Sequence, residues 1–287
     1  ELVDAVCRTA AFKRLEDIKF LGSLDYAYIK NPNGAKGNSR YTRAQHSIGV
    51  AHLAYIYANL AEHCEGDTLL AVAAALLHDV GHGPFSHSIE PLFKRKFGMD
   101  HHRATEEIIL GRVEIGKELN KTFMGFFSGP INFDTVEGIL RSREYLGLQN
   151  TRLHPAKVIT AAYYRETSYH NDIVDEFWRC KGEMYNLAIR SERGVLYDLI
   201  LERMLEVNSD LILEEDFFGT ESQLFAKIPL LRQLSMSNLD IVDFLSLLPS
   251  KIEYQKRVFE VETNASFFER DDKARYVQFK MLRSINI

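Results

Sequence analysis

The sequence predicts a mainly α-helical protein with a small β element near its C-terminus. Over residues 183–213, apolar side chains recur every three or four positions, as on one face of an α-helix. The same spacing is found over residues 48–60. The segments 254–261 and 275–279 are instead strand-like and could pair with each other. Helices therefore dominate the prediction, and two short strands complete it.

The N-terminal part is expected to hold three helices separated by loops. Residues 1–22 show helical spacing, whereas residues 23–40 are rich in Gly, Asn and Pro and indicate a loop. Thr42 or Ser47 is expected to begin the second helix, because both residue types cap helix N-termini. The third helix is expected over residues 68–77.

Further helices are expected at 91–97, 101–119, 133–146 and 237–248. Residues 151–180 show a less regular pattern, and we assign no element to them. We expect one domain over residues 1–210 and a C-terminal extension over 211–287 that packs on the same domain. No segment resembles a flexible linker, and no internal repeat is visible.

Composition and charge favour a globular protein without nucleic-acid or membrane partners. Of the 287 residues, 46% are hydrophobic and 26% charged, which is typical of a chain with a large buried core. The formal net charge of −5 gives no overall attraction to nucleic acid. No run of about 18 apolar residues and no signal-peptide pattern is visible. The three widely spaced cysteines indicate a reducing compartment, so we expect a cytoplasmic protein.

Residues 76–87, LLHDVGHGPFSH, hold three of the ten histidines and are the most informative stretch of the chain. An apolar helix runs directly into the pair His78-Asp79. Imidazole and carboxylate are the usual ligands of iron, manganese, zinc and nickel, so the pair could bind one divalent ion. Alternatively, the stretch is an ordinary helix C-terminus, where His is favoured and Gly supplies the cap. That alternative explains Gly81 but not three histidines and an aspartate together.

Two residues elsewhere in the sequence could complete such a metal site. His46 lies at an expected helix start, and two antiparallel helices joined by a short turn would bring it to His78. On its own, a histidine at a helix start is more often a surface or capping residue. Asp134 opens another expected helix after a Gly-Pro turn. Its alternative role is that of an acid that complements the helix dipole.

A second group, comprising His82, His87, Glu90 and His101, could supply a proton donor. A histidine oriented by a carboxylate can protonate a leaving group at neutral pH. His87 and Glu90 are three residues apart, so one helical turn would bring them into contact. Each histidine alone could be a buried structural residue, but the group as a whole favours catalysis.

The order of these residues resembles the HD-domain phosphohydrolases. The stretch RAQHSIGV at 43–50 followed by HDVGHGPFSH at 78–87 is most similar to their deoxynucleoside triphosphate triphosphohydrolase (dNTPase) branch. The likeness extends to RLEDIKFLG at 14–22 and to INFD at 131–134, and it covers roughly residues 8–210. It implies an HD-domain helical core over 1–210, whereas the C-terminal helices and the β-hairpin expected over 211–287 rest on the sequence pattern alone.

The resemblance also implies a role for each site residue. The metal ligands would be His46, His78, Asp79 and Asp134. The catalytic residues would be His87, His101 and Glu90, with Glu90 orienting a histidine. The substrate-binding residues would be Arg43, His82 and Arg141, with Arg43 contacting a phosphate.

Several positions depart from the dNTPase pattern on the helix that follows the last metal ligand. Gly138 stands where the family has a tyrosine that packs on the sugar, and Ser142 stands where it has an aspartate that contacts the 3′-hydroxyl. The family's lysine is replaced by Thr135, and a glutamine near the base by Phe20. The metal and phosphate half of the site therefore matches the family, whereas the sugar and base half differs.

The sequence thus predicts a metal-dependent phosphohydrolase that acts on a nucleotide. The first hypothesis is a dNTPase-like enzyme that releases nucleoside and triphosphate, with one divalent ion (Fe, Mn, Zn, Ni or Mg) and a second Mg on the substrate phosphates. The second is an HD-type nucleotidase or phosphodiesterase for another small phosphoester. The third is a non-catalytic nucleotide sensor or scaffold. The resemblance also implies a homo-oligomer.

Overall fold

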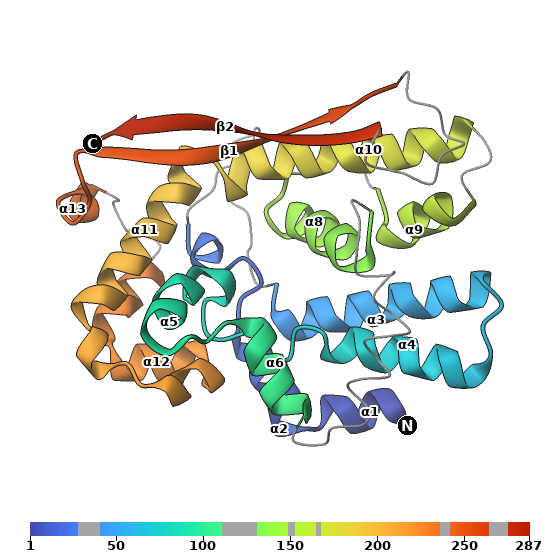
Figure 1. The fold of residues 1–287 in the computed structure, drawn as a ribbon, viewed down its shortest axis with the longest axis horizontal. Helices are drawn as coiled ribbons and strands as arrows, with labels where there is room; N and C mark the ends of the chain where they lie inside the picture. The colour runs from blue at the N-terminus through green and yellow to red at the C-terminus, as the bar shows by residue number, and fades with distance from the viewer. Residues whose placement is uncertain (28–40, 111–130, 149–152, 165–167, 236–241, 264–274) are drawn as a thin grey trace.

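The computed structural model describes residues 1–27, 41–110, 131–148, 153–164, 168–235, 242–263 and 275–287. It has many helices and one two-stranded sheet, which confirms the predicted mainly α fold with a small β element (Figure 1). The helices are α1 (Leu2–Cys7), α2 (Ala10–Lys13), α3 (Arg43–Leu60), α4 (Glu65–Leu77), α5 (Glu90–Phe97), α6 (His101–Leu110), α8 (Phe133–Tyr145), α9 (Pro155–Tyr164), α10 (Ser168–Met184), α11 (Glu192–Val207), α12 (Glu221–Lys227) and α13 (Val242–Leu245). The strands are β1 (Lys251–Val261) and β2 (Tyr276–Asn286).

Helices α3 and α4 form an antiparallel pair below α8 and α9 in the view of Figure 1. Thr42 and Gln45 form a capping box at the start of α3, in which each side chain accepts the backbone N–H of the other. This reciprocal cap satisfies two N–H groups that the first turn leaves unpaired, and it fixes where the helix begins. Arg43 and His46 therefore occupy the first turn of α3, beside His78 at the C-terminal end of α4.

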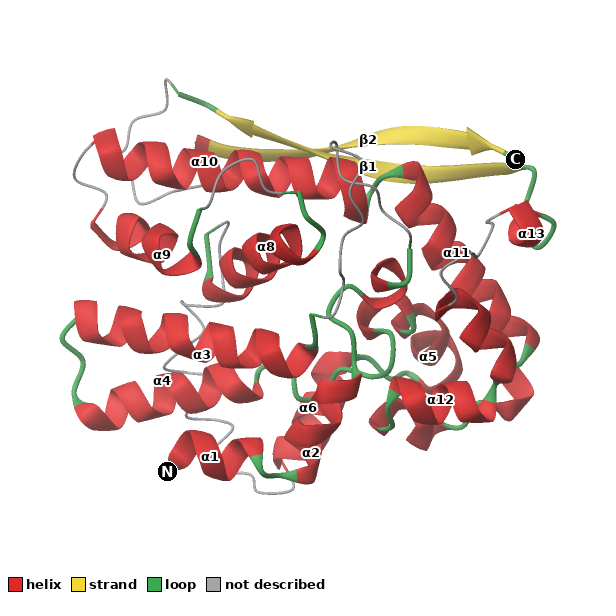
Figure 2. Ribbon diagram, turned by 180° about the vertical axis from the view of Figure 1, so that it is seen from behind, coloured by secondary structure: helices red, strands yellow, loops and turns green. Residues whose placement is uncertain are grey.

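Helices α8 and α9 lie on α3, α10 packs on the outer side of α8 and α9, and the β-ribbon covers α10 (Figure 2). The strands pair in antiparallel register from Lys251↔Asn286 to Val261↔Tyr276. β1 packs on α10, where the Trp178 indole donates a 2.9 Å hydrogen bond to the Glu260 carbonyl. The ribbon is thus attached to the helical layer that covers α3.

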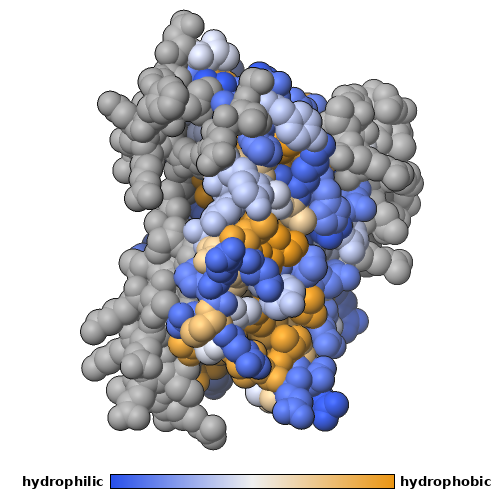
Figure 3. Space-filling view, turned by 90° about the vertical axis from the view of Figure 1, so that its right-hand side faces the viewer, coloured by the Kyte–Doolittle hydropathy of each residue, from blue (hydrophilic) through white to orange (hydrophobic). Residues whose placement is uncertain are grey.

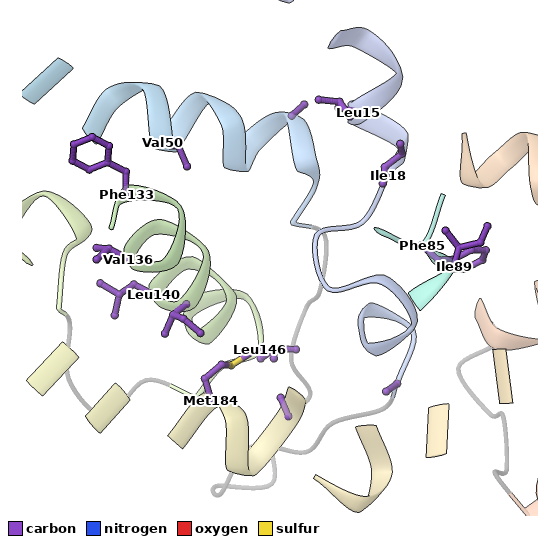
Figure 4. Close-up of a cluster of buried hydrophobic side chains, with 14 of the residues drawn as sticks. Leu15, Ile18, Val50, Phe85, Ile89, Phe133, Val136, Leu140, Leu146 and Met184 are labelled. Atoms are coloured by element: carbon purple, nitrogen blue, oxygen red, sulfur yellow. The ribbon is translucent and has the colours of Figure 1, made fainter. Parts of the chain in front are cut away.

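The hydrophobic core runs between these layers (Figure 4). Val50 of α3 points toward α8, whereas Val136 and Leu140 lie on the side of α8 away from Val50, and all three side chains are buried. Burial of each such side chain stabilises the fold by roughly 1.5–3 kcal/mol. Helix α8 packs directly on α3, and Asp134 thereby lies beside His46.

The C-terminal helices pack on the other half of the molecule, around the segment that follows His78-Asp79. Asp198 of α11 accepts hydrogen bonds from the hydroxyls of Ser23 (2.6 Å) and Ser88 (2.7 Å). Arg14 donates to the carbonyls of Val80 (2.6 Å) and His82 (2.7 Å). The backbone around the site histidines is therefore held by side chains from distant parts of the sequence.

The structure corrects two local predictions. Residues 151–180, to which no element was assigned, contain α9 and most of α10. Pro155 at the first position of α9 is a helix-start signal that we did not use. Residues 1–22 are not one helix but two short helices and 3-10 turns, because a hydrogen bond from Phe12 N–H to the Thr9 hydroxyl starts a new helix. The predicted loop at 28–40 and the helix beyond residue 110 lie outside the described residues.

The surface mixes apolar and polar side chains. Figure 3 shows hydrophobic groups interspersed with hydrophilic ones on the face at the right of Figure 1. Among the described residues, no helix is both long and apolar enough to cross a membrane.

Candidate active site

Two histidines from neighbouring helix ends face each other at the centre of the molecule. The side chain of His46 is completely buried, and its ring centre lies 5.3 Å from that of His78. The Nδ1 atom of His78 lies 2.7 Å from the Ala75 carbonyl, which orients Nε2 toward Asp79. The antiparallel pairing of α3 and α4 therefore brings together two residues that are far apart in the sequence.

Two carboxylates complete this group. Asp134, in the first turn of α8, places Oδ1 3.0 Å from His46 Nε2. Asp79 lies between the two rings, with one oxygen 3.6 Å from His46 Nε2 and the other 3.4 Å from His78 Nε2. The four residues that the resemblance marks as metal ligands thus converge at one point.

Glu137 is a further carboxylate beside His46, one helical turn after Asp134. Its Oε2 atom lies 2.7 Å from His46 Nδ1, and the Tyr41 hydroxyl donates to the same oxygen. A carboxylate on the outer nitrogen of a ligating histidine fixes the tautomer that leaves the other nitrogen free for a metal. Glu137 therefore orients His46, a role that the sequence analysis did not assign to it.

Arg43 is bound to Asp79 on the side away from His78. Its Nη1 donates to Asp79 at 2.6 Å, its Nε to the Ser86 hydroxyl at 2.9 Å, and its Nη2 to the Phe20 carbonyl at 3.0 Å. Arg43 is only 3% exposed. Since a guanidinium has five N–H groups, some remain for a phosphate, but its main visible role is to position Asp79.

Three imidazoles surround the Glu90 carboxylate next to this group. Glu90 Oε1 lies 2.7 Å from Nδ1 of His101, 3.1 Å from Nδ1 of His87 and 3.6 Å from Nδ1 of His82. The rings of His82 and His101 stack with centres 4.3 Å apart. His82 also connects this cluster to the first group, since its Nε2 lies 3.4 Å from Asp79.

Gly81 allows α6 to bring His101 to this position. A Cβ atom at Gly81 would collide with the His101 carbonyl and the Thr105 backbone. In its absence, Gly81 N–H donates a 3.0 Å hydrogen bond to the Thr105 hydroxyl. The close approach of α6 therefore requires glycine between the two histidine groups.

The charges of the first group stabilise one another. Burial would raise the pKa of Asp79, but the positive charges of His78 and Arg43 hold it well below its usual range. Burial would likewise raise the pKa of Asp134, but its hydrogen bond with His46 lowers it to about 2. Both carboxylates are thus anionic at neutral pH, as binding of a divalent ion would require.

The second group holds one carboxylate and at least one neutral imidazole. Burial would raise the pKa of Glu90, but hydrogen bonds with His101 and His87 lower it strongly. The pKa of His82 lies well below its usual value because the ring is buried and faces Arg43. A charged Glu90 can hold a proton on His87 or His101, which a general acid requires.

The donor atoms of the first group suit a divalent ion. Nε2 of His46 is buried and faces the carboxylates of Asp134 at 3.0 Å and Asp79 at 3.6 Å. Donor atoms of His46, His78 and Asp134 all lie within 4.8 Å of one another. Imidazole and carboxylate together suit Fe, Mn, Zn or Ni.

One proposed substrate residue lies apart from the metal group. The Arg141 guanidinium lies 3.5 Å from Glu137 and 3.0 Å from Glu144, and the residue lines a cavity of about 840 Å³ between α3 and α8. By contrast, Lys181 of α10, which the sequence analysis did not select, lies close enough to Asp134 for their charges to interact. It is 8% exposed.

Comparison with known proteins now identifies the core. Residues 43–162 match the HD domain family. These residues thus form an HD domain. The resemblance predicted from residues 43–50 and 78–87 is thereby confirmed.

Curated relatives extend this likeness. Uncharacterized protein YwfO of Bacillus subtilis is 37% identical over 205 residues, which are 68% of this chain and 44% of the relative. A deoxyguanosinetriphosphate triphosphohydrolase-like protein of Caulobacter sp. is 28% identical over 48% of this HD-domain chain and 31% of the relative. The chain thus spans less than half the length of these relatives.

A solved structure shares the fold. The crystal structure of a phosphohydrolase from Bacteroides thetaiotaomicron has a TM-score of 0.58 and 20% identity. The match covers 86% of this chain and 68% of that one. At this identity, the likeness shows the HD-domain fold alone.

Proposed function

We propose that this HD-domain protein is a metal-dependent phosphohydrolase that hydrolyses nucleotides in the manner of a dNTPase, releasing nucleoside and triphosphate. The observation that carries the proposal is the juxtaposition of two groups across Asp79. On one side lie the metal-ligand donors of His46, His78 and Asp134, and on the other lie the imidazoles around Glu90. Relatives named as triphosphohydrolases or triphosphohydrolase-like proteins support the nucleotide substrate.

In the proposed mechanism, His46, His78, Asp79 and Asp134 hold one divalent ion. When bound, such an ion lowers the pKa of a water and polarises a phosphoryl oxygen. Arg43 keeps Asp79 in place and offers its remaining N–H groups to phosphate oxygens. His87 or His101, oriented by its contact with Glu90, would deliver a proton to the leaving oxygen. His82 supplies a neutral ring beside the phosphate chain.

The test is a panel of deoxy- and ribonucleoside mono- and triphosphates, incubated with Mn, Fe or Mg and followed by chromatography. We expect nucleoside and triphosphate from deoxynucleoside triphosphates. Asp79→Ala should lose both bound metal and turnover, because Asp79 faces both histidines. Turnover by a metal-free Asp79→Ala protein would contradict the mechanism.

A second candidate keeps the chemistry but changes the substrate to a nucleoside monophosphate or another small phosphoester. Two features of α8 favour it. Ser142 is 1% exposed, so it cannot take the place of an aspartate that contacts a sugar hydroxyl. A Cβ at Gly138 would lie 2.5 Å from the Phe20 ring, so Phe20 fills the space where the family has a tyrosine.

The same panel distinguishes the candidates. Inorganic phosphate released from a monophosphate would favour the second. Metal binding without turnover of any compound would favour the non-catalytic sensor that the sequence analysis left open. Absence of metal binding would reject the HD-site mechanism itself.

A further inference from the structure

We propose that His82, His87, Glu90 and His101 form a second metal site, selective for Zn²⁺, whose occupation switches the enzyme off. This ion is distinct from the one held by the HD residues and from a Mg that accompanies substrate phosphates. The inhibitory consequence rests on the proposed phosphohydrolase function, whereas the binding of Zn²⁺ does not.

The spacing of the donor atoms carries the proposal. One donor atom from each of the four residues lies within 4.8 Å of the others. Zn–N and Zn–O bonds of about 2.0–2.2 Å in a tetrahedron place ligand atoms about 3.3 Å apart. The Nδ1 atoms of His82 and His87 lie 3.6 and 3.1 Å from Glu90 Oε1, close to that value. His101, whose Nδ1 lies at 2.7 Å and whose ring stacks on that of His82, would need to move away by about half an ångström and turn out of this stack.

An unsatisfied atom points to the same site. Nδ1 of His82 is buried and makes no hydrogen bond to any residue in the described ranges. Leaving a buried polar atom without a partner costs roughly 1–3 kcal/mol, which a metal bond would remove. The side chain of His87, in contrast, is 63% exposed, so an ion can reach the site from solvent. Three imidazoles and one carboxylate suit Zn²⁺ better than Mg²⁺, which prefers oxygen ligands.

Zinc at this site would remove the proton donor. His87 and His101 each direct Nδ1 at Glu90, so their Nε2 atoms are the ones available to a substrate. An imidazolium needs protons on both nitrogens, and Zn²⁺ on Nδ1 takes the place of one of them. The ring can then no longer act as a strong acid, and hydrolysis stops at the step that protonates the leaving oxygen.

The test measures zinc content by mass spectrometry after the metal-free protein is equilibrated with Zn²⁺ alone. We expect two equivalents in the wild type, and one in Asp134→Ala, whose remaining ion belongs to the second site. The double variant His87→Ala/Glu90→Gln should also retain one zinc equivalent, which belongs to the HD site. The triple variant, in which Asp134→Ala is added, should retain none. The control His102→Ala, an exposed neighbour of His101, should retain two.

Co²⁺ gives an independent readout that does not require activity. The Asp134→Ala protein should show the intense visible absorption of four-coordinate Co²⁺, and adding Glu90→Gln should abolish it. Circular dichroism identifies any variant that has unfolded. A single zinc equivalent in the wild type, or a second equivalent that survives His87→Ala/Glu90→Gln, would overturn the proposal.

The inhibitory effect is measured on the wild type loaded with Mn in the HD site. Hydrolysis should fall at least ten-fold as one zinc equivalent binds at the second site. An unchanged or higher rate overturns the inference while the proposed function stands. Two bound equivalents without hydrolysis of any panel substrate would leave the second site in place and reject the proposed function instead.

Discussion

Glu137 is the residue whose role follows most directly from the coordinates, because it fixes the ring of His46 from behind. We expect Glu137→Gln to weaken metal binding 10- to 100-fold, the range typical when the partner of a ligating histidine is removed. Equilibrium dialysis measures the affinity. The matched control is Glu144→Gln, since Glu144 shares the ion pair with Arg141 but does not contact His46. Equal affinities of the two variants would contradict the orienting role.

Lys181 is a buried cation that can assist phosphate binding. Its ammonium lies 4.7 Å from the centre of the Trp178 ring and 5.5 Å from that of Phe259. Burial lowers its pKa to about 8, so it remains largely charged at neutral pH. We expect Lys181→Met to raise KM for a phosphorylated substrate about ten-fold without changing metal content, a loss of about 1.4 kcal/mol.

The control for this change is Lys157→Met, because Lys157 lies 5.5 Å from the Tyr169 ring but is exposed. Steady-state kinetics separate KM from kcat. If KM stays the same in both variants, Lys181 does not contact the substrate.

At the scale of single residues, sequence motifs and one resemblance were enough to select the residues that converge around Asp79. They could not select Lys181, because its proximity to Asp134 arises from packing between α8 and α10. Glu137 could have been selected, since it lies one turn after Asp134 on a predicted helix. The pairing of Arg141 with Glu137 and Glu144 could also have been predicted, since these residues lie four before and three after it on the same predicted helix.

At the scale of elements, α12 is joined to the segment around the site by Glu221. Its Oε1 accepts the backbone N–H of Lys19 (2.8 Å) and of Phe85 (3.2 Å), and the Tyr26 hydroxyl donates to its other oxygen. Glu221 is 1% exposed, and burial raises its pKa to about 7.

This shift predicts how stability depends on pH. The folded protein holds the proton on Glu221 more tightly than the unfolded chain does, so protonation of Glu221 stabilises the fold. This stabilisation is complete below pH 4.5 and is lost as the pH rises to about 7. Relative to Glu221→Gln, the wild type should lose about 3 kcal/mol of unfolding free energy over that range, at 1.36 kcal/mol per pKa unit. Urea unfolding at several pH values measures it.

Glu215→Gln is the control, since Glu215 is exposed near the start of α12. A pH profile of Glu221→Gln that matches the wild type would mean that Glu221 is ionised in the folded protein at all these pH values.

Helix ends explain which elements the sequence predicted well. The capping box at Thr42 and the Asn132 cap of α8 are local signals, so these helices were predicted close to their observed starts. Helix α10 was missed because its buried face includes Trp178 and Lys181, which break the aliphatic pattern. The β-ribbon covers those two side chains, and the local sequence pattern of the helix does not indicate that a distant ribbon packs on it.

At the scale of the whole molecule, the β-ribbon is fixed to α10 by a buried ion pair. Arg275 Nε donates to Asp175 at 2.8 Å, and the Tyr276 hydroxyl donates to the same carboxylate at 3.0 Å. We expect Arg275→Ala to destabilise the protein by about 3–5 kcal/mol, because it leaves Asp175 charged and buried. Thermal or urea unfolding measures this loss.

Arg283→Ala is the matched control, since Arg283 is exposed on β2. Zinc content of the folded Arg275→Ala protein should match the wild type, because the ion pair does not contact the metal group. A loss below about 1 kcal/mol would show that the ion pair contributes little, and that apolar contacts and the Trp178 hydrogen bond hold the ribbon.

Helices α3 and α8 meet at His46 and Asp134, and a metal ion at this contact would also affect the unfolded chain. These residues are about 90 positions apart, so an ion bound to both would act as a reversible cross-link. Closing a loop of that length restricts the unfolded chain, as a disulfide does, and so favours the folded state. Metal supply would then set how long the protein survives in its folded form as well as how fast it works.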